Sequence, residues 1–181
     1  MTIEPTAIPD VKIIRRKAFG DARGYFEETW REEEFLKAGI DAHFVQDNHS
    51  VSSRGVIRGL HWQKPPHCQG KLVCVLVGRI VDAAVDIRKG SPTFGKCVMA
   101  ELSEENHLSL WIPPGFAHGF LVLSEKAHFY YKCTDIYHPE CEAGMRWNDP
   151  TLAIVWPTDG LEVLASPKDT AAQLFSESVA I

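Results

Sequence analysis

The strongest constraint on the fold is a series of short apolar runs, rich in β-branched and aromatic residues, which glycine and proline interrupt at short intervals. Runs of this composition favour extended strands, and the residues between them favour turns. The runs are 71–77, 79–88, 94–102, 107–112, 119–123 and 128–134. Many short strands with frequent turns are typical of β-sandwiches and jelly rolls. We therefore predict an all-β fold of this kind.

Two local patterns refine this prediction. Asp82, Ala84 and Asp86 alternate with the apolar residues between Val81 and Ile87. A period of two is expected for a strand with one polar face. Gly78 separates two strand-like runs and predicts a tight hairpin between them.

Helix signals occur in two places. Thr29 and Glu32 have the spacing of a capping box, and Gly39 is suited to end that helix. Later, Ser166–Asp169 places a capping serine before proline, with a carboxylate in the first turn. This second helix is expected to continue to about residue 175. The prediction is a β protein with a few short peripheral helices.

Charge and cysteine usage exclude several classes of protein. The formal net charge of the 181 residues is −5, and the longest basic cluster is Lys12–Lys17. A general nucleic-acid binder would show a basic stripe, so we expect no nucleic-acid partner. There is no apolar run of membrane-spanning length, and the five cysteines form no CxxC pair. We expect one domain over residues 1–181, reduced, soluble and cytoplasmic, without a membrane partner.

Two segments resemble the paired signatures of cupin barrels: the spacing from Gly55 to His61, and Pro113–His118. A metal-binding cupin usually offers His-x-His followed by glutamate, but position 63 is Gln63 and no glutamate occurs between His61 and Cys97. Two histidines are too few for a catalytic metal with three protein ligands and water. We therefore expect a cupin-type jelly-roll β-barrel without a metal.

Side chains must then carry any chemistry. His61 is the natural candidate because imidazole titrates near neutral pH. Arg58 lies three residues earlier and Lys71 opens the next apolar run. On a regular strand Arg58 and His61 would face opposite sides unless a bulge intervenes. Spacing alone thus leaves a structural core histidine as the alternative.

Motifs along nearly the whole chain, from about residue 3 to 175, resemble the dTDP-4-dehydrorhamnose 3,5-epimerase family. The matching segments are Arg23–Glu28, Gln46–Ser50, Arg58–Gln63, Lys71–Val73, Val85–Gly95, Pro113–Phe120, Tyr131–Pro139 and Ser166–Asp169. Each is weak alone, and their order makes the set specific. The family acts on a nucleotide-linked 4-keto-6-deoxyhexose, whose C3 and C5 protons are both α to the C4 carbonyl. Deprotonation gives an enolate, and reprotonation from the opposite face gives the epimer.

By this resemblance His61 is the base and Asp169 orients it. Tyr131 is the acid that delivers a proton from the other face. Lys71 lies near the C4 oxygen, where a cation offsets developing negative charge. Each residue also has a structural interpretation: Asp169 as a first-turn carboxylate, Tyr131 as a core residue, and Lys71 as a strand-end lysine.

The resemblance also implies nucleotide-binding residues. Arg23 and Arg58 would hold the diphosphate, since guanidinium groups suit phosphate oxygens, and Tyr137 would stack on thymine. Phe26 would pack against the nucleoside or belong to the core. The remaining binding positions are Glu28, Gln46, Asp47, Asn48, Lys71, His118 and Glu142.

The sequence therefore predicts an isomerase, a homodimer without a cofactor, that converts dTDP-4-dehydro-6-deoxy-D-glucose to dTDP-4-dehydro-L-rhamnose. The nearest alternative is a mono-epimerase, acting at C3 or C5 only, on a related nucleotide-linked sugar. A non-catalytic sugar-nucleotide-binding module and a metal-dependent cupin are the alternatives from other classes. Turnover separates the first of these two from an epimerase, and metal analysis separates the second.

Overall fold

The computed structural model describes residues 1–176 and 179–181. Its strands are β1 (Thr2–Pro5), β2 (Lys12–Arg15), β3 (Ala18–Asp21), β4 (Gly24–Glu27), β5 (Gln46–Ser53), β6 (Val56–Gln63), β7 (Lys71–Val77), β8 (Arg79–Asp86), β9 (Cys97–Ser103), β10 (Leu108–Ile112), β11 (Phe116–Val122), β12 (Lys126–Cys133), β13 (Glu142–Gly144) and β14 (Leu164–Ala165). The helical segments are α1 (Glu32–Lys37), the 3-10 turn η1 (Pro139–Cys141) and α2 (Pro167–Thr170). Among the described helices, none is long and apolar enough to cross a membrane.

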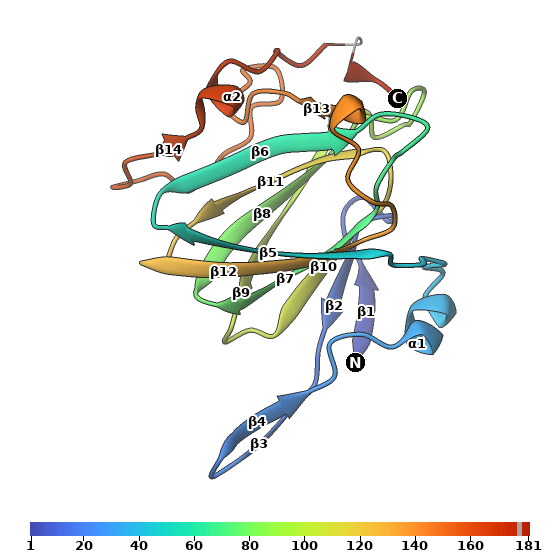
Figure 1. The fold of residues 1–181 in the computed structure, drawn as a ribbon, viewed down its shortest axis with the longest axis vertical. Helices are drawn as coiled ribbons and strands as arrows, with labels where there is room; N and C mark the ends of the chain where they lie inside the picture. The colour runs from blue at the N-terminus through green and yellow to red at the C-terminus, as the bar shows by residue number, and fades with distance from the viewer. Residues whose placement is uncertain (177–178) are drawn as a thin grey trace.

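Two sheets face each other and form the barrel (Figure 1). One has the strand order β1-β2-β10-β7-β12-β5, and the other has β13-β6-β11-β8-β9 with β14 added beside β6 in parallel. The neighbours along each of these two orders pair antiparallel. Chain neighbours such as β11 and β12 alternate between the sheets, as in a jelly roll. The prediction of an all-β, cupin-type jelly roll is confirmed.

The core has two main layers because successive residues of a strand point to opposite faces of its sheet. Between the sheets, Val73 of β7 and Phe129 of β12 pack with Phe120 of β11. On the outer face of the second sheet, Leu60 and other apolar residues pack beneath the segment that follows β13, which contributes Trp156. The C-terminal segment is therefore held against β6, and this contact matters for the site.

The polar face predicted for β8 is present, and it is a buried face of the strand. Asp82 and Asp86 are both fully buried. Ile80 and Ala84, which share their face, belong to the core between the sheets. Both carboxylates thus point into the interior of the barrel, where a carboxylate requires hydrogen bonds or a counter-charge.

Gly78 forms a tight connection but not the predicted hairpin. Strand β7 pairs with β10 and β12, whereas β8 pairs with β9 and β11, so Gly78 carries the chain from one sheet to the other. Its φ is +84°, and a Cβ there would lie 2.1 Å from the carbonyl oxygen of Lys126. A one-residue link is shorter than the usual two-residue hairpin loop, and the chain bends away instead.

The helix signals were partly correct. Helix α1 begins at Glu32 after Arg31, which makes no side-chain cap, so the predicted capping box at Thr29 is wrong. Gly39 follows the helix with a φ of +76°, as expected for its end. Ser166 caps α2 as predicted, but the helix ends at Thr170 rather than near residue 175.

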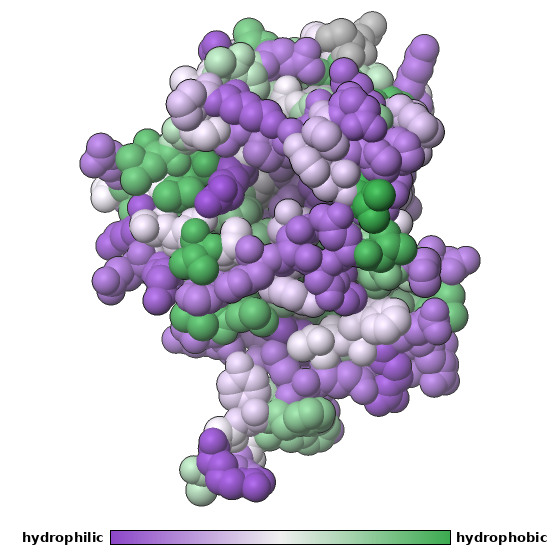
Figure 2. All heavy atoms as spheres, viewed as in Figure 1, coloured by the Kyte–Doolittle hydropathy of each residue, from purple (hydrophilic) through white to green (hydrophobic). Residues whose placement is uncertain are grey.

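The hairpin β3–β4 projects away from the barrel (Figure 1), and Figure 2 shows it as a separate protrusion of the surface. Phe19 and Phe26 face each other across the hairpin and are 55 % and 70 % exposed. Glu27 holds its base, since its carboxylate lies 2.9 Å from Arg16 Nη1 and 3.0 Å from His107 Nδ1. The hairpin is anchored at its base and exposes Phe19 and Phe26 on the pair of residues next to that base.

Candidate active site

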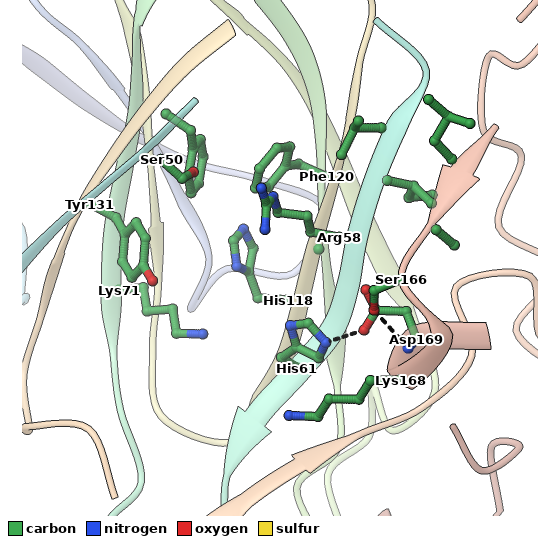
Figure 3. A pocket seen from close by; sticks show the side chains of 16 residues that line it. Ser50, Arg58, His61, Lys71, His118, Phe120, Tyr131, Ser166, Lys168 and Asp169 are labelled. Carbon is green, nitrogen blue, oxygen red and sulfur yellow. Dashed lines mark hydrogen bonds and ion pairs between the residues drawn. The ribbon is translucent and has the colours of Figure 1, made fainter. Parts of the chain in front are cut away.

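A cavity of about 470 Å³ opens between the two sheets, beside the C-terminal segment. Its walls include side chains from β6, β7, β11 and β12 and from residues 164–169. Figure 3 shows polar side chains converging on it from both sheets. The residues that the argument uses are Arg58, His61, Lys71, His118, Tyr131 and Asp169. The structure therefore brings together all four residues predicted to be catalytic.

On one wall, His61 of β6 lies against Asp169 of α2, with 2.5 Å between Nε2 and Oδ1. Asp169 is 4 % exposed, and its backbone N–H donates to the Ser166 hydroxyl that caps α2. The sequence Ser-Pro-x-Asp thus folds a short helical turn whose third residue points its carboxylate at β6. The predicted pairing of these two residues is present as geometry.

This hydrogen bond determines which nitrogen of the neutral His61 imidazole carries the proton. A neutral His61 donates Nε2–H to the Asp169 carboxylate, which leaves the lone pair of Nδ1 to accept a proton. Burial lowers the pKa of His61 below its ordinary 6.5, and the Asp169 carboxylate opposes that shift. His61 is therefore neutral at pH 7 and is paired with a group that stabilises its protonated form.

A bulge explains how Arg58 and His61 reach the same cavity. His118 pairs with His61 and Phe120 pairs with Arg58, so β6 has one more residue than β11 over this stretch. At Gly59, with φ +121°, a Cβ would lie 2.6 Å from Cα of Gly119, so only glycine fits between the strands. The extra residue turns Arg58 to the face that His61 occupies.

Tyr131 of β12 and Lys71 of β7 lie on the opposite wall and point toward His61 across the cavity (Figure 3). Burial raises the pKa of the Tyr131 hydroxyl above its ordinary 10, so the hydroxyl remains a proton donor at neutral pH. Burial lowers the pKa of Lys71 below 10.5, while acidic groups including Asp82 oppose the shift. One wall thus carries an imidazole, and the other carries a phenol and an amine.

His118 of β11 forms a second histidine–carboxylate pair behind the first. Its Nε2 lies 2.9 Å from Oδ2 of the fully buried Asp82. Burial raises the pKa of Asp82, and the nearby His118 and Lys71 oppose that shift. The sequence analysis noted Asp82 only as part of an alternating pattern. A carboxylate in the middle of an apolar strand was the signal that could have marked it as a partner for His118.

The residues expected to hold the nucleotide are distributed along the rim and beyond. The amide oxygen of Gln46 accepts the backbone N–H of Tyr137, and its amide nitrogen donates to Asn48. Asp47 instead accepts from Tyr130 and from Lys132. Successive residues of β5 face opposite sides, so Asp47 points away from the face that Asn48 shares with the barrel interior.

A second set of rim residues is linked through Glu142. Tyr137, 52 % exposed, donates its hydroxyl to Oε2 of Glu142 at 2.8 Å, and Lys168 Nζ lies 2.6 Å from the same oxygen. An exposed aromatic ring held by its hydroxyl is suited to stacking on a flat ring. Lys168 was not among the predicted site residues, and its position beside Asp169 was the available signal.

Arg23, Phe26 and Glu28 do not reach this cavity within the same chain. Phe26 and Arg23 belong to the projecting hairpin, where the guanidinium of Arg23 pairs with Asp21. Glu28, just after β4, pairs with Arg31. The three predicted binding residues thus lie in the projecting hairpin or directly after it, away from His61 and Tyr131 of their own chain.

The barrel is a jelly roll, and its cavity holds a carboxylate-paired histidine opposite a tyrosine and a lysine. These features place the chain among the cupin-type proteins whose site consists of ionisable side chains. The family model described as dTDP-4-dehydrorhamnose 3,5-epimerase matches residues 5–177. The chain belongs to this family, and the prediction of an isomerase of the family is confirmed.

Individual relatives agree with this assignment. The dTDP-4-dehydrorhamnose 3,5-epimerase of Salmonella typhimurium is 51 % identical over 180 residues, which cover 99 % of this chain and 98 % of the relative. The dTDP-4-dehydrorhamnose 3,5-epimerase of Neisseria gonorrhoeae is 52 % identical over 178 residues. These residues cover 98 % of this chain but 54 % of that relative's length.

A solved structure supports the same family. The dTDP-6-deoxy-D-glucose-3,5-epimerase of Legionella pneumophila, crystallised in complex with dTDP-4-keto-L-rhamnose, superposes with a TM-score of 0.92. It is 51 % identical, and the match covers 99 % of this chain and 96 % of that one.

Proposed function

We propose that this chain epimerises C3 and C5 of dTDP-4-dehydro-6-deoxy-D-glucose and so produces dTDP-4-dehydro-L-rhamnose. The observation that carries the proposal is the pair of opposed walls: His61 with Asp169 on one, and Tyr131 with Lys71 on the other. Inversion at carbon requires removal of a proton from one face and delivery to the other. A base and an acid that face each other across one cavity meet this requirement.

The proton and charge balance of each step follows from these groups. Nδ1 of His61 takes the proton from C3 or C5, and the C–H bonding pair moves into the ring to form the enolate at C4. The Asp169 carboxylate stabilises the resulting imidazolium, and the Lys71 ammonium stabilises the enolate oxygen. Tyr131 donates its hydroxyl proton to the opposite face of the carbon. Proton exchange with water then restores neutral His61 and protonated Tyr131 before the second carbon reacts.

The nucleotide would extend from the cavity toward the rim. Arg58, whose Nε donates to Ser52 Oγ at 3.0 Å, is placed to meet the diphosphate with its terminal nitrogens. Tyr137 would stack on thymine, beside Gln46 and Asn48 on the neighbouring strand. His118 and Glu142 would complete the contacts to the sugar and its phosphates.

The working unit is a homodimer in this proposal. Arg23, Phe26 and Glu28 were predicted to bind the nucleotide, yet their hairpin stands away from the cavity of their own chain. Exposed Phe19 and Phe26 need a cover, and the nucleotide-binding roles expected of Arg23 and Phe26 need a position beside a cavity. A second copy that inserts its hairpin beside the first copy's cavity would satisfy both needs. Five free cysteines fit a cytoplasmic enzyme.

The decisive experiment incubates the purified protein with dTDP-4-dehydro-6-deoxy-D-glucose in D2O and follows C3 and C5 by NMR. Deuterium at both carbons, with inversion at both, is the expected result. Deuterium at one carbon alone would identify a mono-epimerase. Binding without exchange would identify a non-catalytic module, and loss of exchange at saturating substrate on treatment with EDTA would favour a metal-dependent cupin.

A further inference from the structure

A cluster of metal-type ligands lies outside the cavity, between the β6–β7 and β12–η1 connections. His67, Asp135 and His138 each offer a ligand atom, and these atoms all lie within 4.8 Å of one another. The imidazole rings of His67 and His138 are stacked, with centroids 3.4 Å apart. All three side chains are partly exposed, so an ion can enter from solvent.

A buried side chain holds the two connections in place. Gln63, 4 % exposed, donates its amide to the carbonyl oxygens of His67 and Ile136 and accepts the backbone N–H of His138. One amide thus ties the backbone of both ligand-bearing connections to the end of β6. Figure 1 shows these connections on the same side of the barrel. The backbone positions of the ligands are set before any ion binds.

The side chains also have the supporting contacts of a metal site. His138 Nδ1 lies 3.0 Å from the Glu140 carboxylate, which leaves Nε2 for an ion. One oxygen of Asp135 accepts the backbone N–H of Ile136, and the other lies 3.0 Å from His67 Nδ1.

We propose that His67, Asp135 and His138 bind a divalent transition-metal ion of the Zn²⁺ class, with water in the fourth position. Two imidazoles and one carboxylate suit such ions better than Mg²⁺ or Ca²⁺, which prefer oxygen ligands. The ion fastens the β6–β7 connection to the segment that carries Tyr137. It lies outside the cavity and takes no part in proton transfer. Metal binding itself does not rest on the proposed function, so either can fail without the other.

The test is titration of the metal-free protein with ZnCl2 by calorimetry. Wild type is expected to bind one Zn²⁺ per chain, and His67→Ala/His138→Ala to bind about 100-fold more weakly or not at all. Asp135→Asn keeps an oxygen that accepts the Ile136 N–H, so the local fold is retained while the carboxylate ligand is lost. Weaker Zn²⁺ binding by this variant would therefore report loss of a ligand and not loss of the fold. Glu140→Gln is expected to weaken binding by about tenfold, since a neutral amide is a weaker acceptor for the His138 Nδ1–H than the carboxylate is.

Two controls make the test specific. A second histidine pair lies on β5 and β12, where His49 Nε2 is 3.2 Å from His128 Nδ1. The variant His49→Ala/His128→Ala therefore removes the same number of histidines as the test variant. It is expected to bind Zn²⁺ like wild type. Co²⁺ replaces Zn²⁺ in a second titration, and its absorption spectrum is expected to lack a thiolate charge-transfer band, which excludes Cys68 as the ligand.

Amide hydrogen exchange gives an independent readout. Zn²⁺ is expected to slow exchange over residues 134–138 in wild type but not in His67→Ala/His138→Ala. Equal Zn²⁺ affinity in wild type and that double variant, or the absence of saturable binding in wild type, would overturn the proposal.

Discussion

The imidazole of His61 and the carboxylate of Asp169 lie 2.5 Å apart although 108 positions separate them in the sequence. His61 belongs to β6, a strand of the barrel wall, and Asp169 belongs to a helix of four residues in the C-terminal segment. The packing of that segment on the outer face of the β6 sheet brings them together. The hydrogen bond that orients the His61 ring therefore depends on an element that lies outside the two sheets.

Substitution of either partner is expected to affect proton transfer to different degrees. His61→Ala removes the base and should lower turnover by about 100- to 10,000-fold. Asp169→Asn keeps the shape but not the charge and should lower turnover by about 100-fold at most. Both rates are measured as loss of the C3 and C5 proton signals in D2O, with circular dichroism as the check on folding. Near-normal turnover of His61→Ala would show that another group is the base.

The pH dependence of kcat/KM tests the electrostatic interaction between His61 and Asp169. His61 must be neutral to accept a proton, and burial holds its pKa below 6.5, so the acidic limb of the kcat/KM profile should lie below that value. The Asp169 carboxylate favours the protonated imidazole and raises this pKa. Asp169→Asn should therefore move the acidic limb of the kcat/KM profile to still lower pH. A limb that moves to higher pH, or stays in place, would contradict a direct electrostatic role for Asp169.

Tyr131 is expected to separate exchange from inversion. Tyr131→Phe removes the proton donor on the face opposite His61, while the base can still remove and return a proton on its own face. Formation of the inverted product should fall by about 100-fold, and deuterium exchange should fall much less. The comparison uses the two NMR signals from a single sample. Tyr130→Phe is the matched control, because that hydroxyl donates to Asp47 on the outer face. If exchange and inversion fell equally, the role of Tyr131 as acid would be wrong.

The local patterns predicted much of the barrel, since a strand's composition and the period of its side chains are set by its own burial. The strand at 71–77 was predicted at its observed bounds. The run at 94–102 was predicted to begin too early, because Ser91 and Thr93 donate to Asp86 and the chain turns at Gly95 before β9 starts at Cys97. That turn depends on a carboxylate from another strand, which local composition does not show.

In the candidate site, too, local sequence patterns could not predict the features that depend on contacts between strands. Spacing on β6 could not place Arg58 and His61 in one cavity, because the bulge at Gly59 depends on the close approach of Gly119 from β11. The pairing of His61 with Asp169 came from the resemblance to a family, not from periodicity. The partnership of Asp82 with His118 was missed, since it joins two strands whose pairing register is fixed only in the folded barrel.

Asp86 is expected to contribute stability that depends on pH. Burial opposes ionisation of its side chain, but hydrogen bonds from Arg88, Ser91 and Thr93 outweigh burial and lower its pKa from 3.8 to about 2. A lowered pKa in the folded state gives stability that is fully present above 3.8 and is lost as the pH falls through about 2. The shift corresponds to about 2 kcal/mol of unfolding free energy.

Asp86→Asn should therefore lower the unfolding free energy at pH 7 by about 2 kcal/mol, measured by urea denaturation. Its loss of stability between pH 4 and pH 2 should also be shallower than that of wild type, because the group that titrates there is gone. Asp10→Asn is the matched control, since its carboxylate pairs with the same Arg88 but is exposed. An equal effect of the two substitutions would contradict a special role for the buried carboxylate.

The projecting hairpin predicts that two inactive variants restore each other. In the proposed homodimer, Arg23→Ala should weaken nucleotide binding at both sites, and His61→Ala should remove the proposed base from both sites. If the hairpin of one copy completes the cavity of the other, a mixed dimer has one site with both defects and one site with neither. Random exchange at equal concentrations should then return about a quarter of the wild-type activity. The measurement is turnover after the two variants are unfolded together and refolded, with each variant refolded alone as the control. If each cavity used its own chain's Arg23, every site in the mixed dimer would carry one defect and activity would not return.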